Sequence, residues 1–377
     1  MRILIMSVTA GEGHNSTAKA MRSYFAEKRV ECDILDTYGY VSPTLSQSLN
    51  RAYLWASSKA KGAYKIGYSL AEKRKPSITE FSPSQLVNMP FAHEIRDYIA
   101  LNRPDAIIFT HPFAGMILDD LKKQGAIVMP TVGILTDFTF HPFWEDCTTN
   151  DFVIMPARSL RHQAYRKGFR EEQLRDFGIP IHPKFALSAP KAETRQALGL
   201  DPDKNTVLLM GGSMGYGNMG TIIEQLDAAV GDSLQIIAVC GNNAKAKADL
   251  ESMETRCRLL PLGFVDYVDR LMDAADCIVT KPGGLTTSEA LAKGLPMVIV
   301  NPIPGQEARN AQFLLNSGTA VATHDMCTAD ELVIRLMDEP RRLEAMRLSI
   351  EELRHPTSTQ DVCEFVMRLC AERTQSR

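Results

Sequence analysis

Short apolar runs recur along the whole chain, and segments long enough for a helix separate them. Apolar runs of this length are typical of parallel strands that are covered on both faces. Their alternation with helices predicts an α/β fold. The pattern occurs twice in tandem, which predicts two Rossmann-like parallel-sheet domains that face a cleft. The expected strands are residues 3–8, 32–36, 106–110, 132–136 and 152–155, followed by 207–210, 235–240, 257–260, 277–279, 297–300 and 320–322.

The segment 178–191 separates the two halves, because prolines and turn residues cluster there. We expect an N-terminal domain over residues 1–185 and a C-terminal domain over residues 186–357. Apolar residues recur at helical spacing over 360–372, so we expect a helix near the end of the chain.

The composition is that of an ordinary globular protein, with 45% hydrophobic and 23% charged residues over 377 positions. A formal net charge of −3 disfavours a general nucleic-acid binder, since such proteins usually carry a basic surface. The eight cysteines form no C-x-x-C pair, which predicts reduced thiols in a cytosolic protein. No apolar run is long enough to span a membrane. The first strand begins at residue 3, which leaves no room for a signal peptide.

The stretch 277–314 carries the most informative chemistry. A buried strand is followed by Gly283 and Gly284, which let the backbone approach a ligand closely. Thr286, Thr287 and Ser288 then supply hydroxyls and a helix N-terminus. Free N–H groups and the helix dipole favour an anion such as a phosphate at that position. The alternative is a generic strand–loop–helix turn of an α/β protein.

Downstream residues of the same stretch suit a sugar nucleotide. Glu289 lies in the first turn of the predicted helix, where its carboxylate can accept hydrogen bonds from a ribose. After the next strand, a predicted loop carries Gln306, Glu307 and Asn310. Amide and carboxylate groups at these positions offer donors and acceptors for hexose hydroxyls. We therefore predict a nucleotide-sugar site here.

A second Gly-rich loop, GGSMGYGNMG, follows the strand 207–210. The backbone N–H groups of Gly212 and Ser213 are suited to cradle a diphosphate. The alternative is a flexible glycine-rich loop, but its position directly after a strand favours phosphate binding.

The first strand runs into the loop TAGEGHNST, where Gly11 and Gly13 predict a tight turn before a helix that begins near Asn15 or Ser16. The third glycine of a dinucleotide fingerprint is absent, which disfavours a nicotinamide or flavin. His14 lies at the carboxyl end of the strand, where open α/β sheets bind ligands. An unperturbed pKa of about 6.5 suits a general base. The alternative is a histidine that only holds the loop by a hydrogen bond.

Polar side chains also close two later strands of the first half. Asp137 comes directly after the fourth strand, and His141 and Trp144 follow it. Asp137 or His141 would orient the base or hold the acceptor hydroxyl. The alternative is that Asp137 caps the loop and Trp144 lies in the core. His111 likewise closes the third strand.

The segment 51–75 contains seven Lys or Arg residues and one Glu, on a slightly acidic protein. Aromatic residues are interleaved with the basic ones. Tyr and Trp favour the headgroup level of a bilayer, and basic groups are attracted to anionic lipids. This pattern predicts peripheral membrane contact without a spanning helix. The alternative is a solvated helix face. The candidate contact residues are Trp55, Tyr64, Lys65 and Tyr68.

Together, these motifs resemble those of the monogalactosyldiacylglycerol synthases and processive diacylglycerol glucosyltransferases. These are family 28 glycosyltransferases, related to the murein lipid-II-forming N-acetylglucosaminyl transferase. The resemblance covers nearly the whole chain and implies GT-B architecture. It also implies that His14 takes part in catalysis and that the backbone near Phe264 and Val265 holds a uracil edge. The motifs are GEGH, TD with HP-x-W, GIPIHP, GGS, GFVD, KPGG and PGQE.

The resemblance implies a reaction as well. A UDP-hexose, either glucose or galactose, would donate its sugar to diacylglycerol with inversion, and the product would be a β-linked glycolipid. The N-terminal domain would dock the acceptor and the anionic inner face of the cell membrane, and a helix over 358–377 would pack back on it. We expect no metal ion and no cofactor, because helix dipoles and hydroxyls can stabilise the diphosphate.

Three other functions remain open from the sequence, one of which is a non-catalytic UDP-sugar sensor that would keep Gln306 and Glu307 but not need His14. The other two are enzymes. One is a UDP-GlcNAc-dependent transferase that acts on a lipid-linked acceptor. The other is a UDP-sugar 2-epimerase, which the basic segment 51–75 disfavours because an epimerase needs no lipid-facing surface.

Overall fold

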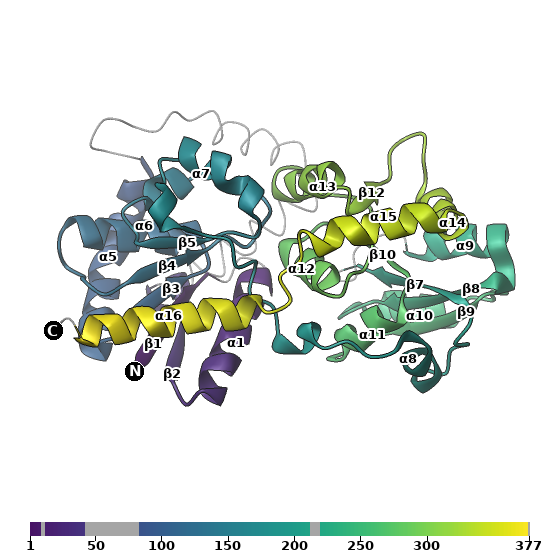
Figure 1. Cartoon of the computed structure of the whole chain (residues 1–377), viewed down its shortest axis with the longest axis horizontal. Coiled ribbons are helices and arrows are strands. Elements are labelled where there is room, and N and C mark those ends of the chain that lie inside the picture. Colours follow the sequence, from purple (N-terminus) through teal and green to yellow (C-terminus); the bar gives the residue numbers. More distant parts are fainter. Residues whose placement is uncertain (9–11, 42–82, 212–218, 376–377) are drawn as a thin grey trace. The chain divides into compact units, whose positions relative to one another are not determined.

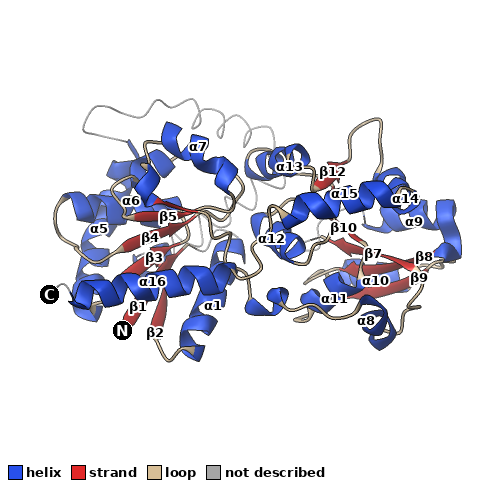
Figure 2. Cartoon of the chain, in the orientation of Figure 1, coloured by secondary structure: helices blue, strands red, loops and turns tan. Residues whose placement is uncertain are grey.

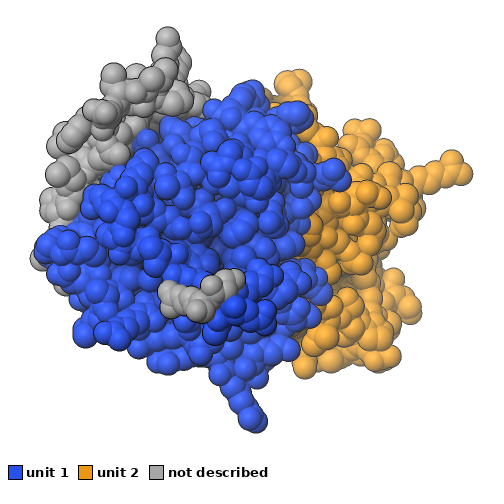
Figure 3. All heavy atoms as spheres, turned by 60° about the vertical axis from the view of Figure 1, so that its left-hand side comes forward, with its two compact units in different colours: residues 1–183, 303–306, 357–377 blue, residues 184–302, 307–356 orange. Residues whose placement is uncertain are grey.

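The computed structural model describes residues 1–8, 12–41, 83–211 and 219–375. They form two compact units, coloured separately in Figure 3. Within these ranges no helix is both long and apolar enough to cross a membrane. Unit 1 comprises Met1–Pro183, Ile303–Gln306 and Thr357–Arg377, and unit 2 comprises Lys184–Pro302 and Glu307–Pro356.

Unit 1 is built on six parallel strands in the order β2-β1-β3-β4-β5-β6, with helices packed around them (Figure 1). Its strands are β1 (Arg2–Ser7), β2 (Glu31–Asp36), β3 (Ala106–Phe109), β4 (Thr131–Ile134), β5 (Phe152–Ile154) and β6 (Leu174–Arg175). Its described α-helices are α1 (Glu12–Glu27), α2 (Thr37–Val41), α5 (Pro83–Asn102), α6 (Pro112–Lys123), α7 (Arg161–Arg166) and α16 (Ser358–Gln375).

The two faces of this sheet are covered by different helices. Ile3 and Ile5 of β1 share a buried apolar cluster with Met21 of α1 and Val362 of α16. Successive side chains of a strand point to opposite faces, and Phe109 of β3 lies on the other face, against α6. Gly115 of α6 makes this contact possible, since a Cβ there would lie 2.4 Å from the Phe109 ring.

The last helix, α16, belongs to unit 1 although unit 2 precedes it in the chain. Val362 and Val366 are fully buried in the core of unit 1. The Tyr24 hydroxyl donates to Glu364 Oε1 at 2.9 Å. At the start of the helix, the Thr359 hydroxyl donates to the carbonyl oxygen of Ile181 at 2.5 Å. Apolar packing and hydrogen bonds therefore both hold α16 on unit 1.

Unit 2 repeats the plan with six parallel strands in the order β12-β11-β10-β7-β8-β9 (Figure 2). Its strands are β7 (Asn205–Met210), β8 (Leu234–Val239), β9 (Arg258–Leu262), β10 (Cys277–Thr280), β11 (Met297–Ile299) and β12 (Ala320–Ala322). Its described α-helices are α8 (Lys191–Ala197), α9 (Met219–Val230), α10 (Ala244–Glu251), α11 (Val268–Ala274), α12 (Gly284–Ala292), α13 (Gln306–Asn316), α14 (Ala329–Asp338) and α15 (Pro340–Glu351).

Each sheet has one point where the strand order reverses. In unit 1 it lies between β1 and β3, and in unit 2 between β7 and β10. Open α/β sheets bind ligands outside the carboxyl ends of the strands at such a point. The sheet order therefore marks one candidate binding region in each unit.

Candidate active site

His14 lies in the first turn of α1, beside the reversal point of the first sheet. Its Nδ1 atom is 2.6 Å from the carbonyl oxygen of Thr110 and 3.2 Å from the hydroxyl of Thr136. Thr110 follows β3 and Thr136 comes soon after β4, so the ring is held at the carboxyl ends of the strands. Because a carbonyl oxygen can only accept a hydrogen bond, Nδ1 carries the proton and Nε2 keeps its lone pair.

Burial lowers the pKa of His14 from its ordinary value of 6.5 and is the largest cause of the shift. The Asp137 carboxylate and the Thr110 carbonyl raise that pKa in part, and His141 lowers it further. Burial removes the water that would stabilise an imidazolium. His14 is therefore neutral at pH 7, which is the protonation state that a general base needs.

His111 packs against His14 with the opposite hydrogen-bonding arrangement. The two ring centroids are 4.8 Å apart, edge to face. His111 is the N-cap of α6, where its Nδ1 accepts a hydrogen bond from the backbone N–H of Phe113 at 3.2 Å. Burial, followed by the neighbouring His14 and His141, lowers the pKa of His111 well below 6.5. The neutral ring therefore carries its proton on Nε2 and is a hydrogen-bond donor at that atom.

Asp137 and His141 form a pair at the carboxyl edge of the same sheet. His141 Nε2 is 2.8 Å from Asp137 Oδ2, and His141 is buried. Gln306 clusters with unit 1, and its Nε2 lies 3.1 Å from His141 Nε2. Asp137 acts on His14 through its charge, which favours the protonated imidazole. The two predicted residues His14 and Asp137 therefore share one site.

Two half-buried aromatic rings extend this site. The Phe113 ring centroid lies 4.8 Å from that of His111 and 5.6 Å from that of Phe143. Phe143 has a φ of 82°, in the left-handed region that a non-glycine side chain rarely adopts. Such a conformation persists only where the surroundings impose it, and it clusters at ligand sites. No sequence pattern singles out these two rings.

Trp144 lies in the core, and its prediction as an acceptor or membrane contact is wrong. Its side chain is 1% exposed. It packs against Phe109, Phe140 and Phe169, with ring centroids 5.8 to 6.4 Å apart. A ring enclosed in this way has no surface left for a lipid. The alternative weighed from the sequence, a core tryptophan, is correct.

The turn before α12 lies beside the reversal point of the second sheet. Gly283 is the N-cap residue, with an extended backbone, and α12 begins at Gly284. No described atom lies within 4 Å of the position that a Cβ on Gly283 would take. A ligand can therefore approach this backbone. The free N–H groups of the first turn of α12 favour an anion there.

The three hydroxyl residues of α12 differ in what they can offer a ligand. Thr286 is partly exposed in the first turn. Thr287 is fully buried, and its hydroxyl has no hydrogen-bond partner among the described residues. Ser288 donates its hydroxyl proton to the carbonyl oxygen of Gly284 at 2.8 Å. All three lie inside the helix, so they are not cap residues.

Glu289 has a strongly perturbed carboxyl group. Burial raises its pKa to about 8, Lys184 lowers it in part, and Asp269 raises it further. Lys184 is itself paired with Asp269, with Nζ 3.3 Å from Oδ1. Near neutral pH the Glu289 carboxyl therefore holds its proton. In that form it both donates and accepts hydrogen bonds, which suits a pair of sugar hydroxyls.

Phe264 and Val265 lie between β9 and α11, at the carboxyl edge of the second sheet. The Phe264 side chain is 71% exposed, while Val265 is half-buried. A large apolar side chain that is this exposed next to a loop leaves a flat face available to a ligand.

Gln306, Glu307 and Asn310 lie on the helix α13, so the predicted loop at these positions is wrong. Gln306 and Glu307 form the first turn and are half-buried. Asn310 is fully buried, and its amide donates to the carbonyl oxygen of Pro282 at 2.9 Å. Asn310 therefore fixes the turn before α12.

Gly13 is the second residue of α1, and a Cβ there would meet no described atom within 4 Å.

Among the described residues, no group of three or more His, Cys, Asp or Glu is arranged to hold a metal ion. Six predicted residues lie outside the described part of the chain: Gly212, Ser213, Trp55, Tyr64, Lys65 and Tyr68.

Two doubly wound parallel sheets, each with one point where the strand order reverses, are the architecture of the GT-B class of glycosyltransferase. MurG of Acinetobacter baumannii has this fold, with a TM-score of 0.64 and 15% identity, over 97% of this chain and 99% of that one. The UDP-GlcNAc 2-epimerase of Neisseria meningitidis is also similar, with a TM-score of 0.59 and 13% identity over 98% of this chain and all of that one. At these identities the likeness concerns the fold alone.

Sequence comparison identifies the family. The "Monogalactosyldiacylglycerol (MGDG) synthase" family matches residues 14–181, and the "Glycosyltransferase family 28 C-terminal domain" matches residues 206–355. This chain belongs to the family 28 glycosyltransferases of the monogalactosyldiacylglycerol synthase type. A relative from Bacillus pumilus (strain SAFR-032), named processive diacylglycerol beta-glucosyltransferase, is 28% identical over 97% of this chain and 94% of its own length.

Proposed function

We propose that this chain transfers a hexose from a UDP-sugar to the free hydroxyl of diacylglycerol. The half-buried, neutral His14 is the observation that carries this proposal. Its Nδ1 proton is committed to the Thr110 carbonyl, so the Nε2 lone pair is the one that can accept a proton. A transferase that attacks a sugar carbon with an alcohol needs a base in this form.

The proposed reaction is a single displacement. Nε2 of His14 takes the proton of the acceptor hydroxyl as its oxygen bonds to the anomeric carbon. The bond between that carbon and the diphosphate oxygen breaks, and UDP leaves with the electron pair. Attack opposite to the leaving group inverts the centre, so an α-linked donor gives a β-linked glycolipid. The Asp137 carboxylate stabilises the imidazolium that forms on His14, because it raises the pKa of that ring.

The donor half of the proposal rests on α12 and its neighbours. The N-terminus of α12 offers N–H groups and a positive dipole end to the departing diphosphate. Thr286 is the accessible hydroxyl of that turn. The protonated Glu289 suits the ribose hydroxyls, and the backbone near Phe264 and Val265 suits the uracil edge. Gln306 and Glu307 are proposed to bind the hexose.

Diacylglycerol is the proposed acceptor because relatives along the whole chain carry it in their names. The rings of Phe113 and Phe143 support an apolar acceptor, since they lie beside the histidines that would hold its hydroxyl. We further propose that the segment 51–75 docks on the anionic inner face of the cell membrane. That part of the proposal rests on its basic and aromatic sequence alone.

A donor-competition assay tests the proposal. Radiolabelled UDP-glucose, UDP-galactose and UDP-GlcNAc are each incubated with the protein and with vesicles that contain diacylglycerol. We expect label in the lipid fraction from one of the two UDP-hexoses, and a β anomer in the NMR spectrum of the product. The variant His14→Ala should lose at least about a hundredfold in rate. His93→Ala, an exposed histidine of α5, is the matched control and should keep full activity.

The other outcomes separate the alternatives. Lipid labelling from UDP-GlcNAc alone would favour the N-acetylglucosaminyl transferase. Conversion of UDP-GlcNAc into its C2 epimer without lipid labelling would favour the epimerase. No label in the lipid fraction from any donor would end the diacylglycerol proposal.

A further inference from the structure

Unit 1 has a hollowed region at the edge of the sheet opposite to His14. One hollow of about 520 Å³ and another of about 560 Å³ adjoin there, and both are lined by Val128 and Arg373. The lining residues Asp105, Pro130 and Asp151 each directly precede a strand of the sheet. The hollows therefore follow the amino ends of the strands, whereas His14 lies at the carboxyl ends. Hollows of this size are typical of small-molecule sites.

The lining of these hollows carries an excess of positive charge. Five arginines and three carboxylates of the described residues form it. Each carboxylate already accepts hydrogen bonds within the protein. Asp105 accepts from the backbone N–H of Arg2 at 2.8 Å. Asp151 accepts from the backbone N–H of Thr131 at 2.8 Å and from Lys122. Glu172 pairs with Arg170 at 2.6 Å.

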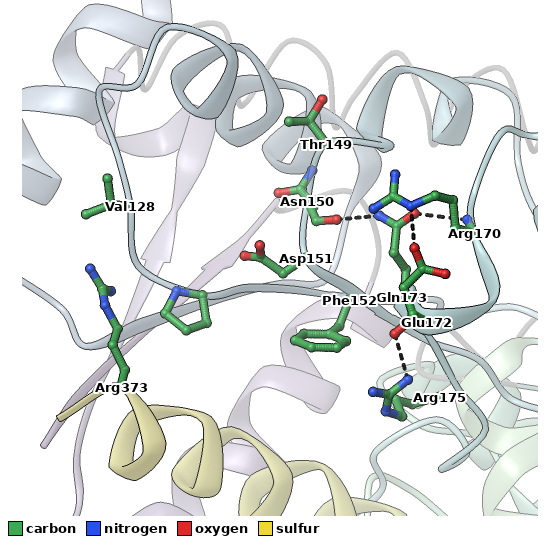
Figure 4. A pocket seen from close by; sticks show the side chains of 11 residues that line it. Val128, Thr149, Asn150, Asp151, Phe152, Arg170, Glu172, Gln173, Arg175 and Arg373 are labelled. Carbon is green, nitrogen blue, oxygen red and sulfur yellow. Dashed lines mark hydrogen bonds and ion pairs between the residues drawn. The ribbon is translucent and has the colours of Figure 1, made fainter. Parts of the chain in front are cut away.

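Three of the arginines have no carboxylate partner among the described residues: Arg103, Arg175 and Arg373. Figure 4 shows Arg373 on one side of the first hollow and Arg175 on the other, with Phe152 between them. Arg175 donates to the carbonyl oxygens of Glu172 and Leu174, and its guanidinium lies 4.9 Å from the centre of the Phe152 ring. These contacts hold the guanidinium in place without cancelling its charge.

Arg103 is held at the second hollow by the backbone. It directly follows α5 with a φ of 47°, in the left-handed region, and its N–H donates to the carbonyl oxygen of Ile99 at 2.8 Å. A non-glycine residue rarely adopts this conformation, which persists where the surroundings impose it. Arg103 and Arg373 line the same hollow. Two guanidinium groups therefore line one hollow, and its carboxylate, Asp105, already accepts a hydrogen bond from the backbone N–H of Arg2.

We propose that these adjoining hollows bind a phosphate-bearing ligand. Guanidinium groups recognise phosphate through paired N–H donors and keep their charge at any physiological pH. Apolar surface lies beside them, since Val128 is 68% exposed at the wall that the two hollows share. A charged phosphate next to an organic group fits this combination better than a bare ion. Both a soluble phosphate ester and the headgroup of an anionic phospholipid have this chemistry.

This site is separate from the transfer site and does not depend on the proposed function. It lies at the amino edge of the sheet, and none of its lining residues belongs to the donor or acceptor constellation. Its test therefore uses no transfer activity.

Chemical modification of arginine provides the test. The full-length protein is treated with phenylglyoxal, and modification at Arg103 and Arg373 is followed by mass spectrometry. The probes are inorganic pyrophosphate, phosphatidylglycerol vesicles and phosphatidylcholine vesicles. Arg341, an exposed arginine of α15, is the internal control. We expect protection of Arg103 and Arg373, but not of Arg341, by pyrophosphate or by phosphatidylglycerol vesicles.

The choice of probes distinguishes a soluble phosphate ester from a phospholipid headgroup. Protection by pyrophosphate indicates a soluble ligand, and protection by phosphatidylglycerol vesicles alone indicates a lipid headgroup. If neither probe protects Arg103 and Arg373, or if phosphatidylcholine protects them equally, the proposal is overturned.

Two variants test whether Arg373 takes part in binding at this site. In Arg373→Gln, the concentration of the effective probe that half-protects Arg103 should rise at least tenfold. Arg341→Gln should leave that concentration unchanged. Equal protection of Arg103 in both variants would contradict a role for Arg373, and the unfolding midpoint of each variant shows whether it is folded.

Discussion

The Nδ1 atom of His14 lies 2.6 Å from the carbonyl oxygen of Thr110, a residue 96 positions further along the chain. This contact decides which ring nitrogen holds the proton. It therefore gives His14, in the first turn of α1 and not in the predicted loop, a defined lone pair at Nε2, as the proposed base requires.

Replacement of Asp137 by Asn should move the pH profile of the enzyme to lower pH. His14 must be unprotonated, and burial already lowers its pKa below 6.5, so the acid limb of kcat/KM should lie below that pH. Asp137 raises this pKa, so its loss as a charge lowers the pKa further. We also expect kcat to fall roughly ten- to a hundredfold, because the imidazolium loses its counter-charge.

The pH dependence of kcat/KM for wild type and Asp137→Asn checks this. Asp97→Asn, which removes an exposed carboxylate of α5, is the control and should follow wild type. An acid limb that stays in place in Asp137→Asn would show that Asp137 does not act on His14.

Replacement of His111 should reveal its structural role at the start of α6. His111→Ala removes the side-chain acceptor for the Phe113 N–H, so the free energy of unfolding should fall by about 1 kcal/mol. His111→Asn keeps a good N-cap and should retain most of that stability. Urea unfolding measures the difference, with the exposed His162→Ala as the control. Equal losses in the Ala and Asn variants would count against the cap.

Glu289 should make the protein less stable as the pH rises. Its pKa is raised from 4.5 to about 8 in the folded state, so the folded protein holds this proton more tightly than the unfolded chain does. Its favourable contribution is present at pH below 4.5 and is lost as the pH rises to about 8. Glu289→Gln cannot titrate, so its stability should decline less over this window.

Thermal unfolding midpoints between about pH 5 and about pH 9 test this linkage. The gap between Glu289→Gln and wild type should widen in favour of the variant as the pH rises. Glu193→Gln, at an exposed position of α8, should parallel wild type. If the Glu289→Gln curve also parallels wild type, the carboxyl is not perturbed in the protein.

The two tryptophans of the chain allow a test of the membrane proposal. In Trp144→Phe, Trp55 is the remaining tryptophan, and its emission should shift to shorter wavelength with phosphatidylglycerol vesicles. In Trp55→Phe, Trp144 is 1% exposed and its emission should not move. Phosphatidylcholine vesicles are the control for charge. An unchanged Trp55 emission with phosphatidylglycerol would argue against docking by the segment 51–75.

The strands of both sheets could largely be predicted, because their apolar runs are local signals. The strand β6 was not predicted, since its two residues, Leu174 and Arg175, are too few to show a period. The sequence predicts a loop in place of α13, because prolines and a glycine stand directly before Gln306 and these turn signals hide a polar first turn.

The candidate site could be predicted in part, because residues that directly follow strands gather at one edge of a sheet. This reasoning predicts that His14 and Asp137 lie near each other. Their partners could not be predicted, since Thr110 and Thr136 lie 96 and 122 positions from His14 and have ordinary local sequence. The same is true of Lys184, which lies far along the chain from Glu289 but influences its charge.

The hydrogen bond between Thr359 and Ile181 has a topological consequence. The chain leaves unit 1 after Pro183, returns to it briefly over Ile303–Gln306 and re-enters it finally at Thr357, and the first and last of these crossings lie next to that bond. Unit 2 is therefore a domain inserted into a host whose cut ends remain together. It is joined to its host mainly through one pair of adjacent crossings, and truncation after residue 183 would also remove α16 and expose the core of unit 1.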